Sequence, residues 1–165
     1  MELLGVRLEL PANAPVVLLQ EQTGERRVLP IYIDSPEAKA IALAVEGHKT
    51  SRPMTHDLLR DVVTALGATV RRVTVTELRD STFYAELSLD VAGQVHVVSS
   101  RPSDAIALAV RTGAPIFAGA AVLDEAATVP EVAAEDGAEE DEIIDEFRDF
   151  IDQVNPEDFG GGKEV

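Results

Sequence analysis

A six-residue repeat constrains the fold of this 165-residue chain more than any other feature of its sequence. The run AIALAV occurs at residues 40–45 and again, unchanged, at residues 105–110, which is 65 positions later. A strand-like run at residues 30–33 precedes the first copy at the same offset as residues 95–98 precede the second. Matching flanks make chance a poor explanation in an alanine-rich chain. The sequence therefore indicates a duplication of two units rather than a solenoid, which usually needs at least about three repeats.

Each half of the repeat, residues 1–48 and residues 66–113, has the pattern of three strands followed by one helix. The turn residues Gln22–Glu25 and Ala92–Gly93 each link two strand-like runs, as in antiparallel hairpins. The sequence therefore predicts an α+β fold of duplicated β-β-β-α halves. We expect the halves to be related by a pseudo-twofold axis and the sheet to be mostly antiparallel.

The helices of the two halves are predicted at residues 36–46 and 101–112. Both are apolar nearly all round, and a helix without a polar face is buried on most sides. Gly47 and Gly113 follow them at positions where left-handed C-caps are expected. Ser35 is expected to be the N-cap of the first helix.

A linking helix is predicted between the halves, at residues 55–66, with Thr55 as its N-cap. Its apolar residues recur at helical spacing and form one stripe. These residues are Leu58, Leu59, Val62, Val63 and Leu66.

The charges divide the chain into a nearly neutral body and an acidic tail. Residues 1–123 hold 14 acids and 12 bases, a net of −2, and the remaining 42 residues hold 16 acids and 2 bases, a net of −14. We predict one domain over residues 1–123, an acidic linker over 124–142, and an acidic C-terminal helix and tail over 143–165. The body has no excess of basic residues, which argues mildly against a protein that binds the phosphate backbone of nucleic acid.

The composition excludes several classes of site. The chain has no cysteine, which excludes disulfides, thiolate metal sites and cysteine nucleophiles. It has no apolar run of about 18 residues, so we expect no membrane-spanning helix. Its N-terminus lacks the layout of a signal peptide, and the expected location is the cytoplasm.

Polar residues cluster just before the helices, at residues 34–37, 52–57 and 99–104. Backbone N–H groups at a helix N-terminus bind anions, and a nearby arginine strengthens that binding. Capping alone is the commoner role of Ser, Thr and Asp at such positions. Arg101 is not a capping residue, and its positive charge opposes the helix dipole. We therefore expect Arg101 to have either a functional role or a place in a specific ion pair.

The usual catalytic motifs are absent from the sequence. It contains no G-x-S-x-G, no H-E-x-x-H and no phosphate-binding G-x-x-x-x-G-K pattern. No two histidines have the spacing of metal ligands. Of the three, His56 is the candidate functional residue, whereas His48 is expected at an exposed helix end and His96 in a strand.

Several segments resemble the bifunctional nuclease domain family, which has DNase and RNase members. The most specific are residues 101–109 (RPSDAIALA) and residues 52–59 (RPMTHDLL). The segments at residues 29–33, 37–41 and 82–85 are similar as well, and the resemblance spans roughly residues 1–125. This chain ends in an acidic segment that is similar to the tails of bacterial members of the family. Plant members have an additional C-terminal module in its place.

The resemblance implies a nuclease that acts on DNA, RNA or both. From the residues themselves, an arginine, a hydroxyl and a carboxylate at one helix start suit a phosphate with a divalent ion, so assistance from Mg²⁺ or Mn²⁺ is a further expectation. The resemblance also implies a cytoplasmic protein that forms homo-oligomers, with a dimer favoured, and that binds nucleic acid rather than a membrane. The expected catalytic residues are His56, Asp57, Asp104 and Glu37, and the expected substrate-binding residues are Arg52, Arg101 and Ser103. No metal ligand is assigned.

A second hypothesis from the same residues is a non-catalytic regulatory module. In that case the helix N-termini of the two halves form a cleft that holds a small anion, or the chain binds a protein partner through its acidic tail. Cleavage of labelled nucleic acid with and without divalent ions distinguishes the two hypotheses.

Overall fold

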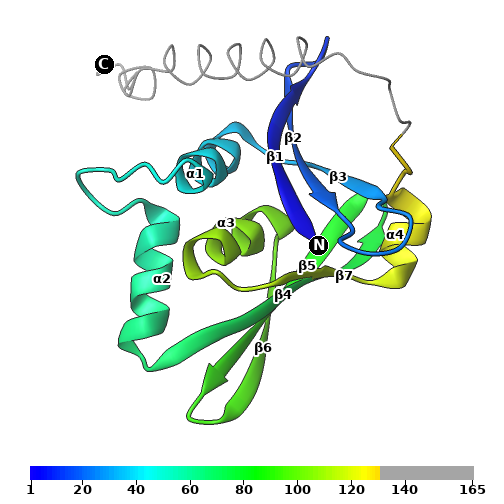
Figure 1. Cartoon of the computed structure of the whole chain (residues 1–165). Coiled ribbons are helices and arrows are strands. Elements are labelled where there is room, and N and C mark those ends of the chain that lie inside the picture. The colour runs from blue at the N-terminus through cyan, green and yellow to red at the C-terminus, as the bar shows by residue number, and fades with distance from the viewer. Residues whose placement is uncertain (131–165) are drawn as a thin grey trace, which may run out of the picture. The chain divides into compact units, whose positions relative to one another are not determined.

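Residues 1–130 are described by the computed structural model and form seven strands and four helices (Figure 1). In chain order these are β1 (Glu2–Glu9), β2 (Ala14–Gln20), β3 (Val28–Tyr32), α1 (Ser35–Val45), α2 (Thr55–Ala65), β4 (Ala68–Arg79), β5 (Thr82–Val91), β6 (Gln94–Ser100), α3 (Pro102–Thr112), β7 (Ile116–Ala118) and α4 (Ala120–Ala126). The predicted linker at 124–142 lies largely outside the described residues, and the predicted helix and tail at 143–165 lie wholly outside them. Within residues 1–130, no helix has the length and apolar character needed to cross a membrane.

The first three strands form an antiparallel sheet in the order β1-β2-β3. Successive side chains of a strand point to opposite faces, and Val17, Leu19, Leu29 and Ile31 are accordingly buried in the core. The register between β1 and β2 shifts near Gly5, as at a β-bulge. Helix α1 packs against β1 and β2.

The second sheet has the strand order β6-β5-β4-β7. Strand β7 runs parallel to β4, and the other neighbours are antiparallel. Ala92 and Gly93 join β5 to β6 with φ angles of 52° and 83°, which fits a two-residue hairpin with two positive φ values and confirms the predicted turn. Helix α3 packs against β4 and β5, and Val73, Val75 and Leu87 share its buried core cluster.

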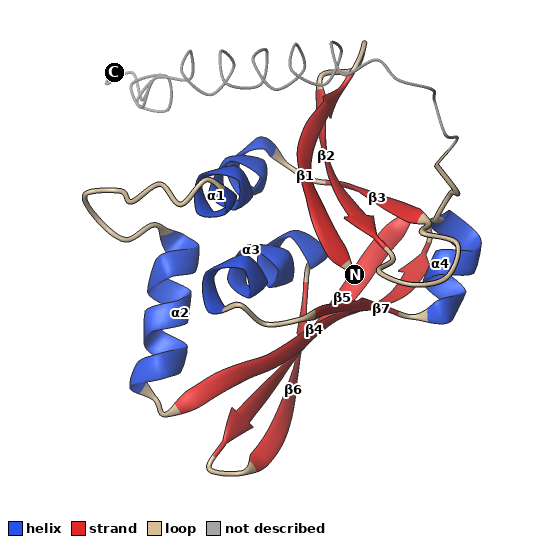
Figure 2. Cartoon of the chain, viewed as in Figure 1, coloured by secondary structure: helices blue, strands red, loops and turns tan. Residues whose placement is uncertain are grey.

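The two copies of the repeat lie in α1 and α3, which pack side by side (Figure 2). The alanines of the repeat have small side chains, and helix separation decreases with the size of the side chains at the contact. Ile41, Ile106 and Leu108 are fully buried between the helices and the sheets. The expectation that the repeated helices are buried on most sides therefore holds best for α3.

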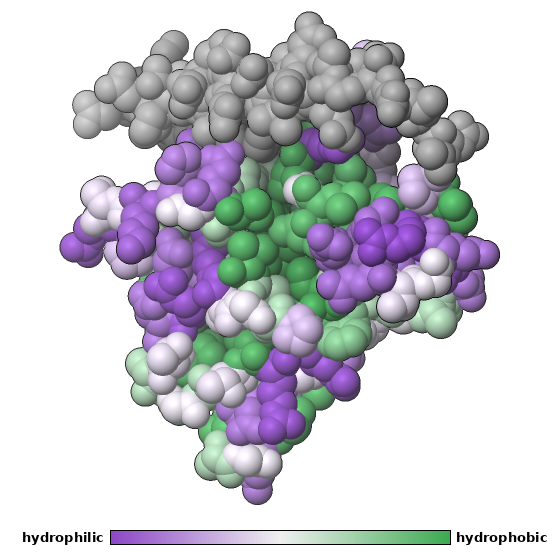
Figure 3. Space-filling view, in the orientation of Figure 1, coloured by the Kyte–Doolittle hydropathy of each residue, from purple (hydrophilic) through white to green (hydrophobic). Residues whose placement is uncertain are grey.

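Helix α2 differs from the other two because only His56 of its eleven residues is buried. Its predicted apolar stripe exists, but Leu58, Val62 and Leu66 are exposed. In the view of Figure 3, apolar surface gathers over β1 and β2, between hydrophilic surfaces over α1 and α2 and over the β2–β3 turn. The described residues thus leave apolar groups uncovered in more than one place.

The structure confirms the α+β class and the mostly antiparallel pairing. Three strands precede one helix in each half, whereas the pseudo-twofold relation between the halves stays a prediction. The predicted N-caps are wrong, because Ser35 and Thr55 are already helical and Asp34 and Met54 precede them as N-caps.

The start of α2 and the ends of α1 and α3 each have a recognisable capping arrangement. The Asp57 carboxylate accepts a hydrogen bond from the Met54 N–H at 2.9 Å, so the third helical residue satisfies the backbone donor of the N-cap residue, as in a capping box. Gly47 and Gly113 have φ angles of 69° and 70°, which confirms the expected left-handed conformation after α1 and α3.

Candidate functional site

Arg101 joins two carboxylates at the N-terminal ends of α1 and α3. Its Nη2 donates to Glu37 Oε1 at 2.7 Å, and its Nε donates to Asp104 Oδ2 at 2.8 Å. Asp104 Oδ1 lies 3.1 Å from His56 Nε2. These four residues, here called the Arg101 cluster, come from three helices and bring together four of the seven predicted site residues.

The packing of the helices explains how the cluster forms. Helices α1 and α3 lie side by side, and the C-terminal residues of both line one pocket, so their N-termini share the opposite end. Glu37 and Asp104 are first-turn acids, which the positive end of the helix dipole favours. Arg101, the N-cap of α3, bridges the two acids across the gap between the helices.

The cluster carries one excess negative charge when His56 is neutral. Burial opposes ionisation of Asp104, but hydrogen bonds from Arg101 and His56 outweigh burial and hold the pKa of this carboxyl below its ordinary 3.8. The Asp104 hydrogen bond also raises the pKa of Arg101 above its ordinary value, with Glu37 adding to the effect. Because an ionised Asp104 can only accept, the proton of a neutral His56 lies on Nε2, and Nδ1 is then the acceptor.

Arg101 combines this anchoring with access to solvent. Its side chain is 58% exposed. Its Nη1 takes part in none of the hydrogen bonds found among residues 1–130. A guanidinium presents its donors in a rigid planar fork that suits carboxylate and phosphate oxygens. Arg101 can therefore offer Nη1 to an anion while its other nitrogens stay bound to protein.

Two buried polar atoms, one in the cluster and one in the residue before Arg101, have no hydrogen-bond partner among the described residues. They are Glu37 Oε2 and Ser100 Oγ. Buried polar atoms without partners are uncommon in folded proteins. Glu37 therefore keeps one acceptor atom that the contacts with Arg101 do not use.

A pocket of about 330 Å³ opens beside Arg101. Its walls come from the end of β3, the turn between β4 and β5, and the start of α3, and they include Tyr32, Asp34, Phe83 and Ser103. Asp34 is exposed and brings a carboxylate to the same pocket as Arg101. The pocket thus combines a cation, a carboxylate, hydroxyls and two aromatic rings.

Sequence reasoning did not assign the residues of β3 and of the β4–β5 turn to the site. Tyr32 and Phe83 lie in the segments 29–33 and 82–85 that resemble the family, but neither was assigned to the site, because only the folded chain brings their segments to the start of α3. The sequence did offer a way to find Asp34, because this residue belongs to the polar cluster at residues 34–37 just before a predicted helix.

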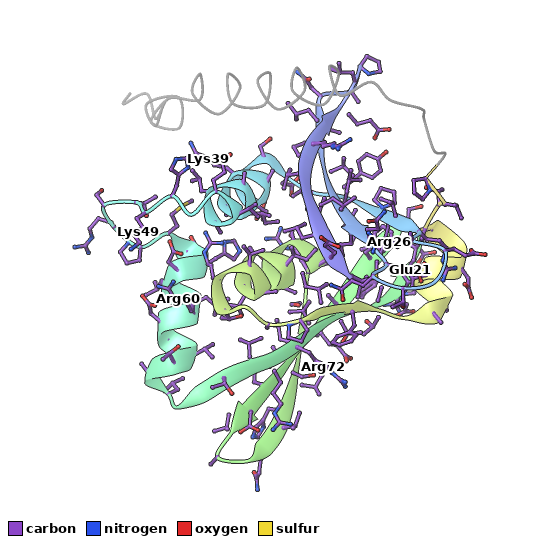
Figure 4. All side chains as sticks on the ribbon, viewed as in Figure 1. Glu21, Arg26, Lys39, Lys49, Arg60 and Arg72 are labelled. Atoms are coloured by element: carbon purple, nitrogen blue, oxygen red, sulfur yellow. The ribbon has the colours of Figure 1, made fainter. Side chains whose placement is uncertain are left out.

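Asp57 lies next to His56 in the chain but does not join the Arg101 cluster. It accepts a hydrogen bond from Arg111 Nε at 2.7 Å, and Arg111 also donates to the carbonyl oxygens of Ala107 and Ala40. The Arg111 side chain is only 5% exposed. This ion pair ties α2 to α3 and α1. It borders a second pocket of about 440 Å³, whose lining also includes Lys49 and Arg60 (Figure 4).

The structure places the two remaining predicted site residues differently. Ser103 is buried and lines the pocket beside Arg101. Arg52 is exposed in the loop between α1 and α2 and lines neither of the two pockets. The fold therefore connects Ser103, but not Arg52, to the Arg101 cluster.

The donor set does not fit a resident divalent ion in the arrangement described. Among residues 1–130, no group of three or more His, Asp or Glu side chains is placed to hold a metal. The guanidinium of Arg101 already occupies the position between the Glu37 and Asp104 carboxylates. A dependence on Mg²⁺ or Mn²⁺ therefore stays a prediction.

The carboxyls of Asp57 and Asp104 predict a loss of stability in acid. Burial opposes ionisation of Asp57, but the hydrogen bonds from Arg111 and Met54 outweigh it and hold its pKa below 3.8, as for Asp104. A lowered folded-state pKa stabilises the fold above the ordinary pKa, and this contribution is lost as the pH falls through the folded value. Urea unfolding should therefore show falling stability below about pH 4.

The matched variants for this prediction are Asp57→Asn and Asp61→Asn. Asp57→Asn should show a smaller change of stability with pH than the wild type, because it lacks one of the two shifted carboxyls. Asp61 is half-exposed and pairs with Arg60 on the surface of α2, so Asp61→Asn should follow the wild type. Equal pH dependence in Asp57→Asn and the wild type would contradict the assignment.

Comparison with known proteins gives relatives along most of the chain. Residues 17–131 match the family described as the bifunctional nuclease domain. An uncharacterised protein of Mycobacterium tuberculosis is 43% identical over 162 residues, which cover 96% of each chain.

Plant proteins match a shorter part. Bifunctional nuclease 2 of Arabidopsis thaliana is 33% identical over 112 residues, which cover 65% of this chain and 34% of the plant protein. Bifunctional nuclease 2 of Oryza sativa subsp. japonica is 28% identical over 116 residues, which cover 68% and 35%. The family match contains the whole Arg101 cluster and the residues that line the pocket beside it, and on this evidence the chain belongs to the bifunctional nuclease domain family.

Proposed function

We propose that this protein hydrolyses phosphodiester bonds of nucleic acid that binds in the pocket beside Arg101. The observation that carries the proposal is Arg101 itself, an exposed guanidinium with an unused Nη1 at the mouth of a pocket. The names of the plant relatives support nuclease chemistry, and the match to the family covers the residues involved.

In this proposal Arg101 binds the phosphate and stabilises the charge that develops on it. Glu37 and Asp104 orient the guanidinium through their hydrogen bonds, and His56 in turn contacts Asp104 and orients it. The N-termini of α1 and α3 add favourable dipoles for an anion at the same end of the molecule. Such preorganised donors account for a large part of catalysis in phosphoryl transfer.

Asp34 is the proposed proton acceptor. Its carboxylate lines the same pocket as Arg101, so a water molecule between them would lie near both. The water oxygen attacks phosphorus, its proton passes to Asp34, and the P–O bond to the leaving oxygen breaks as that oxygen takes a proton from solvent. His56, Asp104 and Glu37 then act by positioning Arg101 rather than by transferring protons.

The excess negative charge of the cluster weakens phosphate binding, because it partly cancels the charge of Arg101. The proposal therefore includes modest affinity for nucleic acid. A divalent ion brought by the substrate, a cytoplasmic location and a dimer remain part of the proposal as expectations from the family.

The test is cleavage of end-labelled single-stranded and duplex DNA and RNA by the full chain, with Mg²⁺, with Mn²⁺ and with a chelator. Asp34→Asn should lower kcat by roughly 10² or more with little change in KM. Its fold should persist, because the Asp34 side chain makes no capping hydrogen bond. Glu86→Gln is the matched control, since Glu86 is exposed on β5 and lines neither pocket.

Two outcomes would contradict nuclease function at this site. One is the absence of cleavage of every substrate under every ionic condition. The other is activity in Asp34→Asn equal to that of the wild type, which would indicate a contaminating enzyme or another site.

The second candidate function is a regulatory module that binds a small anion in the same pocket. It is favoured by the pairing of two helix N-termini with an exposed arginine and by the cluster's lack of a resident metal site. The cleavage assay and a phosphate-binding measurement on Arg101→Ala distinguish the two functions, because the regulatory module predicts no cleavage but phosphate or nucleotide binding that Arg101→Ala abolishes.

A further inference from the structure

Strand β6 is an edge strand with an unusually open outer side. Among residues 1–130 it forms the end of its sheet and pairs with β5 alone. Six of its seven residues are exposed. Figure 2 shows its turn end projecting away from the four helices. Alternate N–H and C=O groups of an edge strand point outward and can pair with another strand.

The side chains of β6 add apolar surface to this free edge. Val95, Val97 and Val98 are each exposed. Val98 pairs with the buried Leu87 and so lies on the face that α3 covers, whereas Val95 and Val97 lie on the opposite face. An exposed valine-rich edge is a site where proteins associate or aggregate unless something protects it.

The other edges of the two sheets carry protection of the usual kinds. Strand β1 has charged residues and a bulge near Gly5. Strand β3 contains Pro30, and Val28 forms a bridge to Thr128. Strand β7 is only three residues long. Strand β6 has no proline, no bulge and no acidic or basic residue other than His96.

We propose that β6 is the dimerisation edge of this protein, and that it pairs antiparallel with β6 of a second copy. Full overlap of residues 94–100 with their counterparts places the twofold axis at Val97. Val97 then faces Val97 of the partner subunit, and Val95 faces Ser99 of the partner subunit. The two four-stranded sheets become one continuous sheet.

The sequence of β6 suits a second copy because it is self-complementary in this register. On the uncovered face, Val97 meets Val97 of the partner subunit at the axis as an apolar pair, and the small Ser99 of the partner subunit lies opposite Val95. No pair of like charges meets, since the strand has no Lys, Arg, Asp or Glu. An antiparallel pair of identical strands is also isologous, which gives a closed dimer rather than a filament.

This inference does not depend on nuclease activity, and disulfide cross-linking in the full chain tests it directly. The protein has no cysteine, so each single-cysteine variant reports one position. Directly opposed residues of an antiparallel pair have Cα atoms about 4.5 or 5.5 Å apart, within the range of about 4.4–6.8 Å that a disulfide spans. Val97→Cys should therefore form a covalent dimer on mild oxidation.

Two variants serve as controls for Val97→Cys. Val95→Cys is on the same strand and face, but its distance from its own counterpart along the strand is roughly 14 Å in this register. Leu58→Cys is on the exposed stripe of α2 and matches Val97 in exposure, 57% against 58%. We expect Val97→Cys to cross-link at least about tenfold faster than either control, because proximity raises the effective concentration of the thiols.

Sedimentation of Val97→Lys gives a second readout that needs no oxidation. Two lysines would face each other at the axis, so this variant should be monomeric at concentrations where the wild type and Leu58→Lys are dimeric. A monomeric wild type, or dissociation by Leu58→Lys but not by Val97→Lys, would overturn the proposal. Cross-linking of Val97→Cys no faster than that of Leu58→Cys would overturn it as well.

Discussion

Arg111→Ala is expected to lower the free energy of unfolding by about 3 to 5 kcal/mol, which is the usual effect of removing one partner of a buried ion pair. The Arg111 side chain is 5% exposed and donates to Asp57 and to the carbonyl oxygens of Ala40 and Ala107. Without it, a carboxylate loses its cationic partner and two carbonyl groups each lose a hydrogen bond where three helices meet. The loss is a large fraction of the stability of an ordinary domain.

The matched control is Arg60→Ala. Arg60 pairs with Asp61 on the surface of α2, where both side chains are about half exposed. An exposed pair of this kind contributes about 1 kcal/mol or less. Urea unfolding of the two variants should therefore separate them clearly. Similar losses in Arg111→Ala and Arg60→Ala would contradict a structural role for the buried pair.

A double-mutant cycle connects this result to the predicted catalytic role of Asp57. Asp57→Ala with Arg111→Ala should destabilise much less than the sum of the single changes, because neither group is then left unpaired. We expect the effect of Asp57→Ala on cleavage to follow its effect on the folded fraction. A loss of kcat in a fully folded Asp57 variant would restore Asp57 to the catalytic residues.

The sequence predicted the helices well because the repeat constrained them twice. Two identical six-residue runs with the same spacing to strand-like flanks indicated both α1 and α3, and the hairpin turn at Ala92 and Gly93 followed from local chemistry. The first residue of each helix was less certain, since Ser35 and Thr55 suit either the cap or the first turn.

The site was predictable as a set of polar clusters but not as a set of contacts. His56 and Asp57 are neighbours in the chain, yet consecutive residues of a helix point in directions about 100° apart. His56 therefore reaches Asp104 and Asp57 reaches Arg111, near opposite ends of α3. Arg111 itself gave no signal, because an arginine in the last turn of a helix is an ordinary feature.

Arg101→Ala is expected to lower kcat/KM for phosphodiester cleavage by roughly 10² to 10³, the usual effect of removing one preorganised group that stabilises the reacting oxygens. The guanidinium is the exposed member of its cluster, and its Nη1 donates to neither Glu37 nor Asp104. Arg101→Lys should recover only part of the loss, because an ammonium keeps the charge but not the planar fork.

Arg101→Ala should change the free energy of unfolding little, by about 1 kcal/mol or less. Arg101 is largely exposed, Asp104 keeps its contact with His56, and Glu37 keeps the favourable dipole of the α1 N-terminus. Arg72→Ala is the matched control, because Arg72 is an exposed arginine on β4 that lines neither pocket (Figure 4). It should leave both cleavage and unfolding unchanged.

Measured together, cleavage and urea unfolding distinguish a functional Arg101 from a structural one. A large loss of kcat/KM at nearly unchanged stability is the result that the geometry predicts. A large loss of stability in Arg101→Ala would instead show that the bridge between Glu37 and Asp104 serves mainly to hold α1 against α3. Unchanged cleavage in a stable Arg101→Ala would place the phosphate elsewhere, and Lys49, which lines the second pocket, would become the next candidate (Figure 4).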